Sequence, residues 1–155
     1  GVTELTAVDL FENRLQKAAE LGASYALNSA SIDVEAFVMK LTEGRGLDLV
    51  FETAGNPVTF QLAQKLVRPG GKLVLVGNIA QPTSVRFMEF SEREIDIISV
   101  FRYRNKFPMA ISAVSSGRIP VRSIATDVFV FQQTQEAFEH ALHEKQSVLK
   151  AIVAL

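Results

Sequence analysis

Two charged residues near the start of the chain could bind the ribose of a nucleotide. Asp9 follows the apolar run Leu5–Val8, and an acid at the end of such a strand can accept hydrogen bonds from ribose hydroxyls. The same carboxylate would repel a 2′-phosphate, so it favours NAD over NADP. Asp9 could equally cap the helix expected after it. Arg14, one turn into that helix, could reach the same ribose or could simply be solvated.

Two glycines stand at the ends of predicted buried strands. Gly55 comes shortly after Leu47–Phe51, and Gly77 directly follows Lys72–Val76. A glycine at a strand end lets a ligand approach the backbone closely, although ordinary turns use glycine equally often. Together with Asp9, the two glycines predict a cleft along one edge of the sheet, where ligands of open α/β sheets bind.

A third candidate segment combines cations with aromatic rings. The run VFRYRNKF at residues 100–107 holds Arg102, Tyr103 and Arg104, and such interleaving can bind nucleic acid through stacking and phosphate pairing. The balanced overall charge argues against that use. The segment lies at the carboxyl end of a predicted strand, where a sheet enzyme places substrate and cofactor contacts. The alternative is a charged loop whose aromatic side chains pack inward.

Composition excludes several classes of protein. The chain has 155 residues, of which 48% are hydrophobic and 21% charged, so it can form one domain with a sizeable core. A net charge of −1 gives no general attraction to nucleic acid or to an anionic membrane. No apolar run is long enough to span a bilayer, and the amino terminus does not resemble a signal peptide. The absence of cysteine fits a reducing environment, so we expect a cytoplasmic protein with neither nucleic-acid nor membrane partners.

No metal site or nucleophile is visible in the sequence. His140 and His143 share a predicted helix with Glu136 and Glu139, but zinc sites usually need three or four convergent ligands. We therefore expect both histidines on a solvated face. No serine stands in a motif that would activate it as a nucleophile.

Strand-like and helix-like segments alternate along the chain, which is typical of parallel strands joined by crossover helices. Pro69 and Gly70 predict a turn at residues 68–71. We expect an α/β, Rossmann-like, doubly wound and mostly parallel sheet. The expected strands are Leu5–Val8, Tyr25–Leu27, Leu47–Phe51, Lys72–Val76, Ser84–Phe87, Ile95–Phe101, Ser123–Phe131 and Ala151–Leu155, and the expected helices are Asn13–Leu21, Asp33–Thr42, Val58–Val67, Pro108–Ser115 and Thr134–Glu144.

This pattern lacks the first strand and the Gly-rich loop of a dinucleotide-binding fold. In the strand order 3-2-1-4-5-6, the missing strand would lie in the middle of the sheet. Its absence leaves two unpaired strand edges, which invite pairing with another chain. We therefore expect either a rearranged pairing or a second copy of the chain covering these edges, and hence a homo-oligomer assembled through sheet edges.

Several segments, taken in order, resemble the cofactor domain of zinc-dependent medium-chain dehydrogenases. They are TAVDLFENRLQKAAELGASYALN, GRGLDLVFETAGN, LVRPGGKLVLVGN and IDIISVFRYRNKFPMAI. The run VFRYRN followed by FPMAI is most similar to the sorbitol (polyol) dehydrogenase branch. The resemblance covers nearly the whole chain, and it depends on the ordered set of segments.

The resemblance implies a role for particular residues. Asp9 and Arg14 would bind the adenosine ribose of NAD. The nicotinamide side would be lined by Val76, Gly77, Asn78, Val100, Phe101 and Arg102. Arg102 and Tyr103 match positions that contact substrate or zinc-bound water in polyol dehydrogenases. Asn78 departs from the branch, which often has an apolar residue there.

The resemblance also implies a reaction and a domain organisation. In the intact family, zinc polarises an alcohol while its hydride moves to NAD. Residues 1–155 would form a single partial NAD-binding domain, without the amino-terminal catalytic domain that supplies the zinc ligands. We therefore expect no catalytic and no metal-binding residues in this chain, and no activity from the chain alone. The parent enzyme would oxidise a small polyol or secondary alcohol.

Two other functions fit parts of the pattern. Methyltransferases that bind adenosylmethionine also carry an acid after the second strand and an RPGG-type turn. Their sheets usually end in an antiparallel hairpin, whereas here a predicted helix precedes the last strand, which favours a dehydrogenase. A non-catalytic oligomerisation module, assembled through the strand Ile95–Phe101, is the third alternative.

Overall fold

The computed structural model describes residues 2–155, which divide into two compact units. Residues Asp33–Phe107 form one unit. The other comprises the chain up to Ile32 together with Pro108–Leu155. Every strand pairing in the described part of the chain is parallel, and helices alternate with the strands. The architecture is therefore the Rossmann-like α/β class that the sequence predicts.

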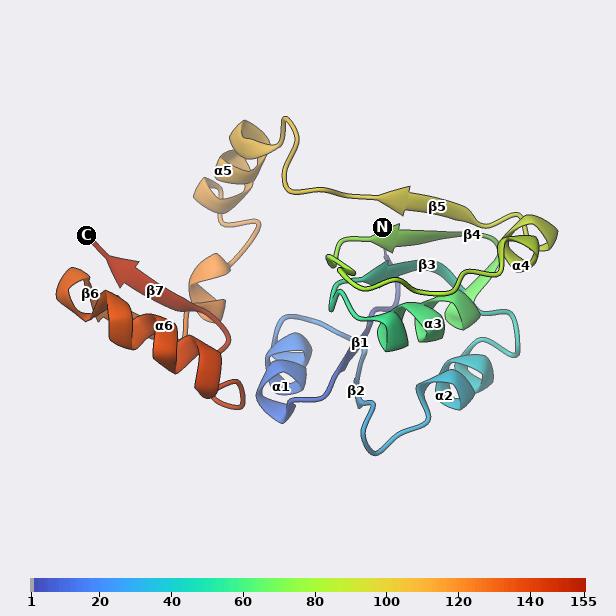
Figure 1. Cartoon of the computed structure of the whole chain (residues 1–155), viewed down its shortest axis with the longest axis horizontal. Helices are drawn as coiled ribbons and strands as arrows, with labels where there is room; N and C mark the ends of the chain where they lie inside the picture. Colours follow the sequence, from blue (N-terminus) through green and yellow to red (C-terminus); the bar gives the residue numbers. More distant parts are fainter. Residues whose placement is uncertain (1) are drawn as a thin grey trace. The chain divides into compact units, whose positions relative to one another are not determined.

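The unit formed by Asp33–Phe107 holds one three-stranded sheet, with strand order β3-β4-β5. These strands lie side by side in Figure 1, next to helix α3. The elements of this unit are α2 (Val34–Leu41), β3 (Leu47–Glu52), α3 (Pro57–Leu66), β4 (Val67–Leu75), α4 (Phe87–Glu92) and β5 (Asp96–Ser99).

The core of this unit lies on one face of its sheet. Phe60 of α3 and Phe90 of α4 pack with Leu73 of β4, which is fully buried. Both helices therefore cover the same face. On the other face, Phe51 of β3 is 56% exposed and Ile98 of β5 is 42% exposed. Both residues pair with Val74 of β4, so they lie on either side of it in the sheet.

The turn predicted at residues 68–71 is a bulge inside β4. Leu47 pairs with Val67, but Leu49 already pairs with Lys72, so the intervening residues project from the ladder opposite Asp48. Arg68 Nε donates to Asp48 Oδ1 at 2.6 Å, and Arg45 Nη1 donates to the same oxygen at 3.1 Å. Hydrogen bonds from Arg68 and then Arg45 lower the pKa of this carboxyl group.

The prediction of a strand at Ser84–Phe87 is wrong. This segment is irregular, and helix α4 begins at Phe87. The helix spans only six residues, too few for a helical period to be visible in the sequence. Its position is fixed by Phe90, which is 7% exposed and contributes to the core, while Phe87 is 71% exposed.

The second unit contains two separate strand pairs, β1-β2 and β6-β7. The predicted strand Ser123–Phe131 is shorter than expected, because 3-10 turns at Val121–Ile124 and Phe131–Gln133 flank β6. No helix within residues 2–155 is long and apolar enough to cross a membrane. The elements are β1 (Thr6–Asp9), α1 (Glu12–Glu20), β2 (Tyr25–Asn28), α5 (Phe107–Ser115), β6 (Asp127–Val130), α6 (Thr134–His143) and β7 (Ala151–Ala154).

Strands β1 and β3 each keep an open edge. Among the described strands, β1 pairs only with β2, and β3 pairs only with β4. These pairings lie within the compact units. The two alternatives for the open edges, a rearranged pairing or a second copy of the chain, both stay predictions.

Candidate functional site

A cavity of about 350 Å³ lies at the carboxyl ends of β4 and β5. Four residues that the sequence predicts as cofactor contacts meet in its wall, although they come from two segments of the chain. Parallel pairing explains this, because Leu75 pairs with Ser99 and so brings both strand ends to one edge. The cavity is lined by Leu75, Gly77, Asn78, Ile79, Ala80, Ser99, Val100 and Phe101.

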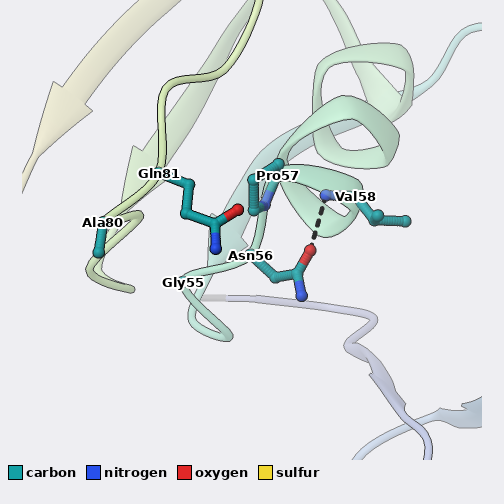
Figure 2. Close-up of a pocket in the computed structure, with 6 residues that line it drawn as sticks. All are labelled: Gly55, Asn56, Pro57, Val58, Ala80 and Gln81. Atoms are coloured by element: carbon teal, nitrogen blue, oxygen red, sulfur yellow. Dashed lines mark hydrogen bonds between the residues drawn. The ribbon is translucent and has the colours of Figure 1, made fainter.

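A second cavity, of about 390 Å³, lies at the beginning of α3. Figure 2 shows Gly55, Asn56, Pro57 and Val58 on one side and Ala80 and Gln81 on the other. The Asn56 side chain caps the helix, since its Oδ1 accepts a hydrogen bond from Val58 N at 2.8 Å. Ala80 lines both cavities, which are therefore neighbours at this edge of the sheet and are together called the groove below.

Gly55 and Gly77 bring the ends of β3 and β4 into direct contact. A Cβ atom added at Gly77 would lie 2.1 Å from Gly55 N and 2.6 Å from Gly55 Cα. Gly55 itself has a φ of +69°, which disfavours other residues. Both glycines are thus required by the close approach of two backbones, and this approach forms the floor of the groove.

Glu52 holds that floor in place, and the sequence prediction missed it. Its side chain is 3% exposed and ends β3 beneath the two glycines. The carboxylate accepts hydrogen bonds from Ala54 N at 3.0 Å, Gly55 N at 2.9 Å and Thr59 Oγ1 at 2.7 Å. The available signal was an acid that closes the apolar run LDLVF directly before the turn.

The remaining predicted residues of this unit flank the cavity. Val76 N donates a hydrogen bond to Glu52 O at 2.8 Å. Val76 is 41% exposed and is not one of the residues that line the cavity. Arg102 adopts a left-handed φ of +59°, and its guanidinium stacks over the Phe101 ring at 5.1 Å. Tyr103 contacts the ring of Phe107 edge-on. The alternative of inward-packed aromatic side chains is wrong, because Phe101 is 71% and Tyr103 58% exposed.

Asp9 and Arg14 belong to the other compact unit and lie together at the end of β1. Asp9 Oδ1 accepts hydrogen bonds from Leu10 N at 2.8 Å and Phe11 N at 3.1 Å. Asp9 Oδ2 lies 3.5 Å from Arg14 Nη1, whose guanidinium also stacks on Phe11. The residue that caps α1 is Phe11, so Asp9 orders the turn before the helix and is not its N-cap. Oδ2 accepts no backbone hydrogen bond, and the Asp9 side chain is 30% exposed.

The described residues hold no metal centre. No group of three or more His, Cys, Asp or Glu side chains converges anywhere in residues 2–155. The expectation that both histidines are solvated holds only in part, because His140 Nε2 lies 3.2 Å from Asp127 Oδ1 and its ring contacts Phe129 edge-on. This contact connects α6 with β6. Because no third ligand converges there among the described residues, the pair does not form a zinc site.

A parallel sheet with a groove at the carboxyl ends of its strands defines the class of α/β proteins that bind nucleotides at that edge. Residues 1–116 match the zinc-binding dehydrogenase family, and the chain belongs to that family. It is 39% identical over 155 residues to YdjJ, an uncharacterised zinc-type alcohol dehydrogenase-like protein of Escherichia coli K12, and 38% identical over 156 residues to sorbitol dehydrogenase of Bacillus subtilis. These alignments cover 100% and 99% of the chain and 44% of each relative.

Solved structures agree with the family. An Escherichia coli oxidoreductase of unknown specificity superposes with a TM-score of 0.92 at 40% identity, covering 99% of this chain and 44% of the other. A short chain alcohol dehydrogenase of Escherichia coli CFT073, solved with the cofactor NADH, superposes with a TM-score of 0.90 at 26% identity, covering 99% and 45%. The chain thus spans less than half the length of the proteins it matches.

Proposed function

We propose that this chain is the nicotinamide-cofactor-binding part of a zinc-dependent enzyme that oxidises a polyol or secondary alcohol with NAD. The observation that carries the proposal is the groove at the ends of β4 and β5, whose wall contains Gly77, Asn78, Val100 and Phe101. The resemblance of the sequence to medium-chain dehydrogenases implies the same four residues as nicotinamide contacts. Membership of the zinc-binding dehydrogenase family supports the same assignment.

The residues of the groove fit the face of a flat ring better than an anion. Gly77 has no side chain to obstruct the backbone, and Val100 and Phe101 offer apolar surface. The buried carboxylate of Glu52 beneath them disfavours a phosphate at this end. NAD, once bound, accepts the hydride removed from an alcohol carbon. The role of this chain is to bind and orient that cofactor. We propose that Arg102 and Tyr103, which follow the residues of the groove in the sequence, contact the hydroxyl groups of the substrate.

Titration of the purified chain with nicotinamide cofactors tests the proposal. We expect isothermal titration calorimetry to detect binding of NAD⁺ and NADH, with weaker binding of NADP⁺. Adenosylmethionine serves as the comparison ligand, because the methyltransferase alternative requires it to bind. Binding of adenosylmethionine alone would contradict a dehydrogenase role, and binding of no ligand would favour the oligomerisation module.

The methyltransferase alternative is disfavoured by the pairing of β6 with β7. Those sheets usually close with an antiparallel hairpin, whereas β6 and β7 pair in parallel and are joined through α6. The family match points the same way.

We propose that Asp9 and Arg14 bind the adenosine ribose. Replacing Asp9 by asparagine retains an oxygen that can accept the Leu10 and Phe11 amide hydrogens but removes the charge. We expect NAD⁺ affinity to fall about tenfold, because a hydrogen bond to a charged group contributes roughly 1.5 to 3 kcal/mol. NADP⁺ should lose less, since the repulsion of its 2′-phosphate is relieved.

Asp33→Asn is the matched control for this titration. Asp33 is also an acid at the start of a helix, and its Oδ1 accepts a hydrogen bond from Ala36 N at 3.0 Å. Its substitution should leave both affinities unchanged. Equal NAD⁺ affinity for Asp9→Asn and the unmodified chain would remove Asp9 from the proposed site.

We propose that catalysis needs residues outside this chain. The described residues contain no cluster that could hold zinc, so the metal ligands would belong to another domain of the parent enzyme, and residues 1–155 would be one partial domain. The purified chain should therefore not oxidise polyols. Measurable NAD-dependent oxidation of sorbitol by this chain would contradict the proposal. The absence of cysteine is compatible with work in the cytoplasm.

We further propose that the chain self-associates through its open sheet edges. The unpaired edges of β1 and β3 present free backbone donors and acceptors, which favour pairing with a second copy. Light scattering should give a mass above that of one 17.0 kDa chain. A monomer at all concentrations would rule out this arrangement.

A further inference from the structure

We propose that the buried carboxylate of Glu52 biases this site toward the oxidised form of the nicotinamide cofactor. The inference rests on the proposed function, since it requires that the nicotinamide ring binds at the Gly77 end of the groove. It assigns to Glu52 two separable effects, one through its hydrogen bonds and one through its charge.

The first effect is positional. Glu52 Oε1 accepts hydrogen bonds from Ala54 N, Gly55 N and Thr59 Oγ1, and Oε2 lies 3.2 Å from Gly55 N. The backbone of the same residue accepts from Val76 N and Gly77 N, at 2.8 and 2.9 Å. One residue therefore fixes both strand ends that form the floor of the groove.

The second effect depends on where the charge lies. A Cβ atom at Gly77 would be 2.6 Å from Glu52 Oε2, so the carboxylate is directly behind the backbone that lines the cavity. Gly77 therefore contacts both the carboxylate and the groove. Any other residue at position 77 would put a side chain between the two.

None of the lysine, arginine or histidine side chains that the structure describes neutralises this carboxylate. Its hydrogen-bond donors are two backbone amides and a hydroxyl group, and within residues 2–155 it forms no ion pair with a lysine, arginine or histidine. At 3% exposure it is also poorly screened by solvent. The groove therefore lies in the field of a buried negative charge.

That field distinguishes the two forms of the cofactor. The nicotinamide ring is positively charged in NAD⁺ and neutral in NADH, so a nearby negative charge stabilises the oxidised form selectively. Hydrogen bonding and packing by Glu52 would affect the binding of both forms alike. A change in the ratio of the NAD⁺ and NADH affinities therefore measures the effect of the Glu52 charge. An equal change in both affinities measures the effect of its hydrogen bonds on the position of the backbone.

The test compares three chains by calorimetry, with NAD⁺ and NADH as the probes. Glu52→Gln has nearly the same shape but no charge, and Asp48→Asn removes an exposed carboxylate from the same strand. We expect Glu52→Gln to lower the affinity for NAD⁺ relative to NADH by about fivefold, as a charge several ångströms away in a partly screened site would. Asp48→Asn should leave the ratio unchanged.

The outcomes separate this inference from the proposed function. If the unmodified chain binds both cofactors and Glu52→Gln leaves their ratio unchanged, the inference is wrong and the cofactor site stands. If the unmodified chain binds neither, the proposed function fails and the inference fails with it. Should Glu52→Gln not fold, Glu52→Asp replaces it. That variant keeps the charge, so both affinities should fall while their ratio stays within about twofold of the original, and a larger change in the ratio would overturn the inference.

Discussion

Replacing Gly77 by alanine is expected to destabilise the chain by about 3 kcal/mol, because the new methyl group has no space. The Cβ atom would lie 2.1 Å from Gly55 N, 2.6 Å from Gly55 Cα and 2.6 Å from Glu52 Oε2. Most of these neighbours are backbone atoms, which cannot move aside as a flexible side chain can. The floor of the groove must therefore shift, and NAD⁺ binding should be lost together with stability. Urea unfolding and calorimetry measure the two effects.

Gly44→Ala is the matched control, because it adds the same atom elsewhere in the same unit. Gly44 has a φ of +80°, but nothing lies within 4 Å of the added Cβ. Only the cost of a left-handed conformation remains, which is about 1 kcal/mol. NAD⁺ affinity should not change in this variant. If the two substitutions cost the same free energy, the contact between Gly55 and Gly77 is not tight in solution.

Truncation of Leu73 to alanine is expected to have a comparable effect, with a loss of about 3 to 4 kcal/mol. Leu73 is fully buried between Phe60 and Phe90, in the core shared by α3, α4 and the sheet. Its removal leaves a cavity that two helices anchored on a sheet cannot readily close. The midpoint of urea unfolding, followed by circular dichroism, measures the loss.

Leu49→Ala is the comparison for this truncation. Leu49 lies in the neighbouring strand β3 of the same sheet and is 41% exposed. Because much of its apolar surface is already in water, the expected loss is about 1 kcal/mol. A loss equal to that of Leu73→Ala would mean that another surface covers this face in solution, which a second copy of the chain would explain.

Much of the candidate site followed from local patterns. The apolar runs that form β3 and β4 are rich in Val and Leu, and the contacts implied by the family resemblance in this unit follow the ends of β4 and β5. The cap at Asp33 was also expected, and its side chain does accept the hydrogen bond from Ala36 N. These features depend on residues close together in the sequence, where periodicity and turn chemistry are informative.

Other features could not be read from neighbouring residues. Helix α4 replaces a predicted strand because Phe90 finds a place in the core, which is a contact with residues far away in the chain. The aromatic side chains of Phe101 and Tyr103 after β5 are exposed, contrary to one of the two alternatives, and the chain between them adopts a left-handed conformation at Arg102. Tertiary packing determines such features, because it outweighs the weak preference of a short segment for helix or strand.

The sequence by itself determined the α/β class, the order of the elements apart from α4, and which residues end strands at a common edge. Only the tertiary structure decided that Gly55 and Gly77 touch each other. It also decided that Glu52 is buried beneath them, with three hydrogen-bond donors and no ion-pair partner among the described residues. The physical reason is that strand and helix patterns report which face of an element is apolar. The partner of a buried polar group depends on which distant segments the fold brings together, and no local pattern records that.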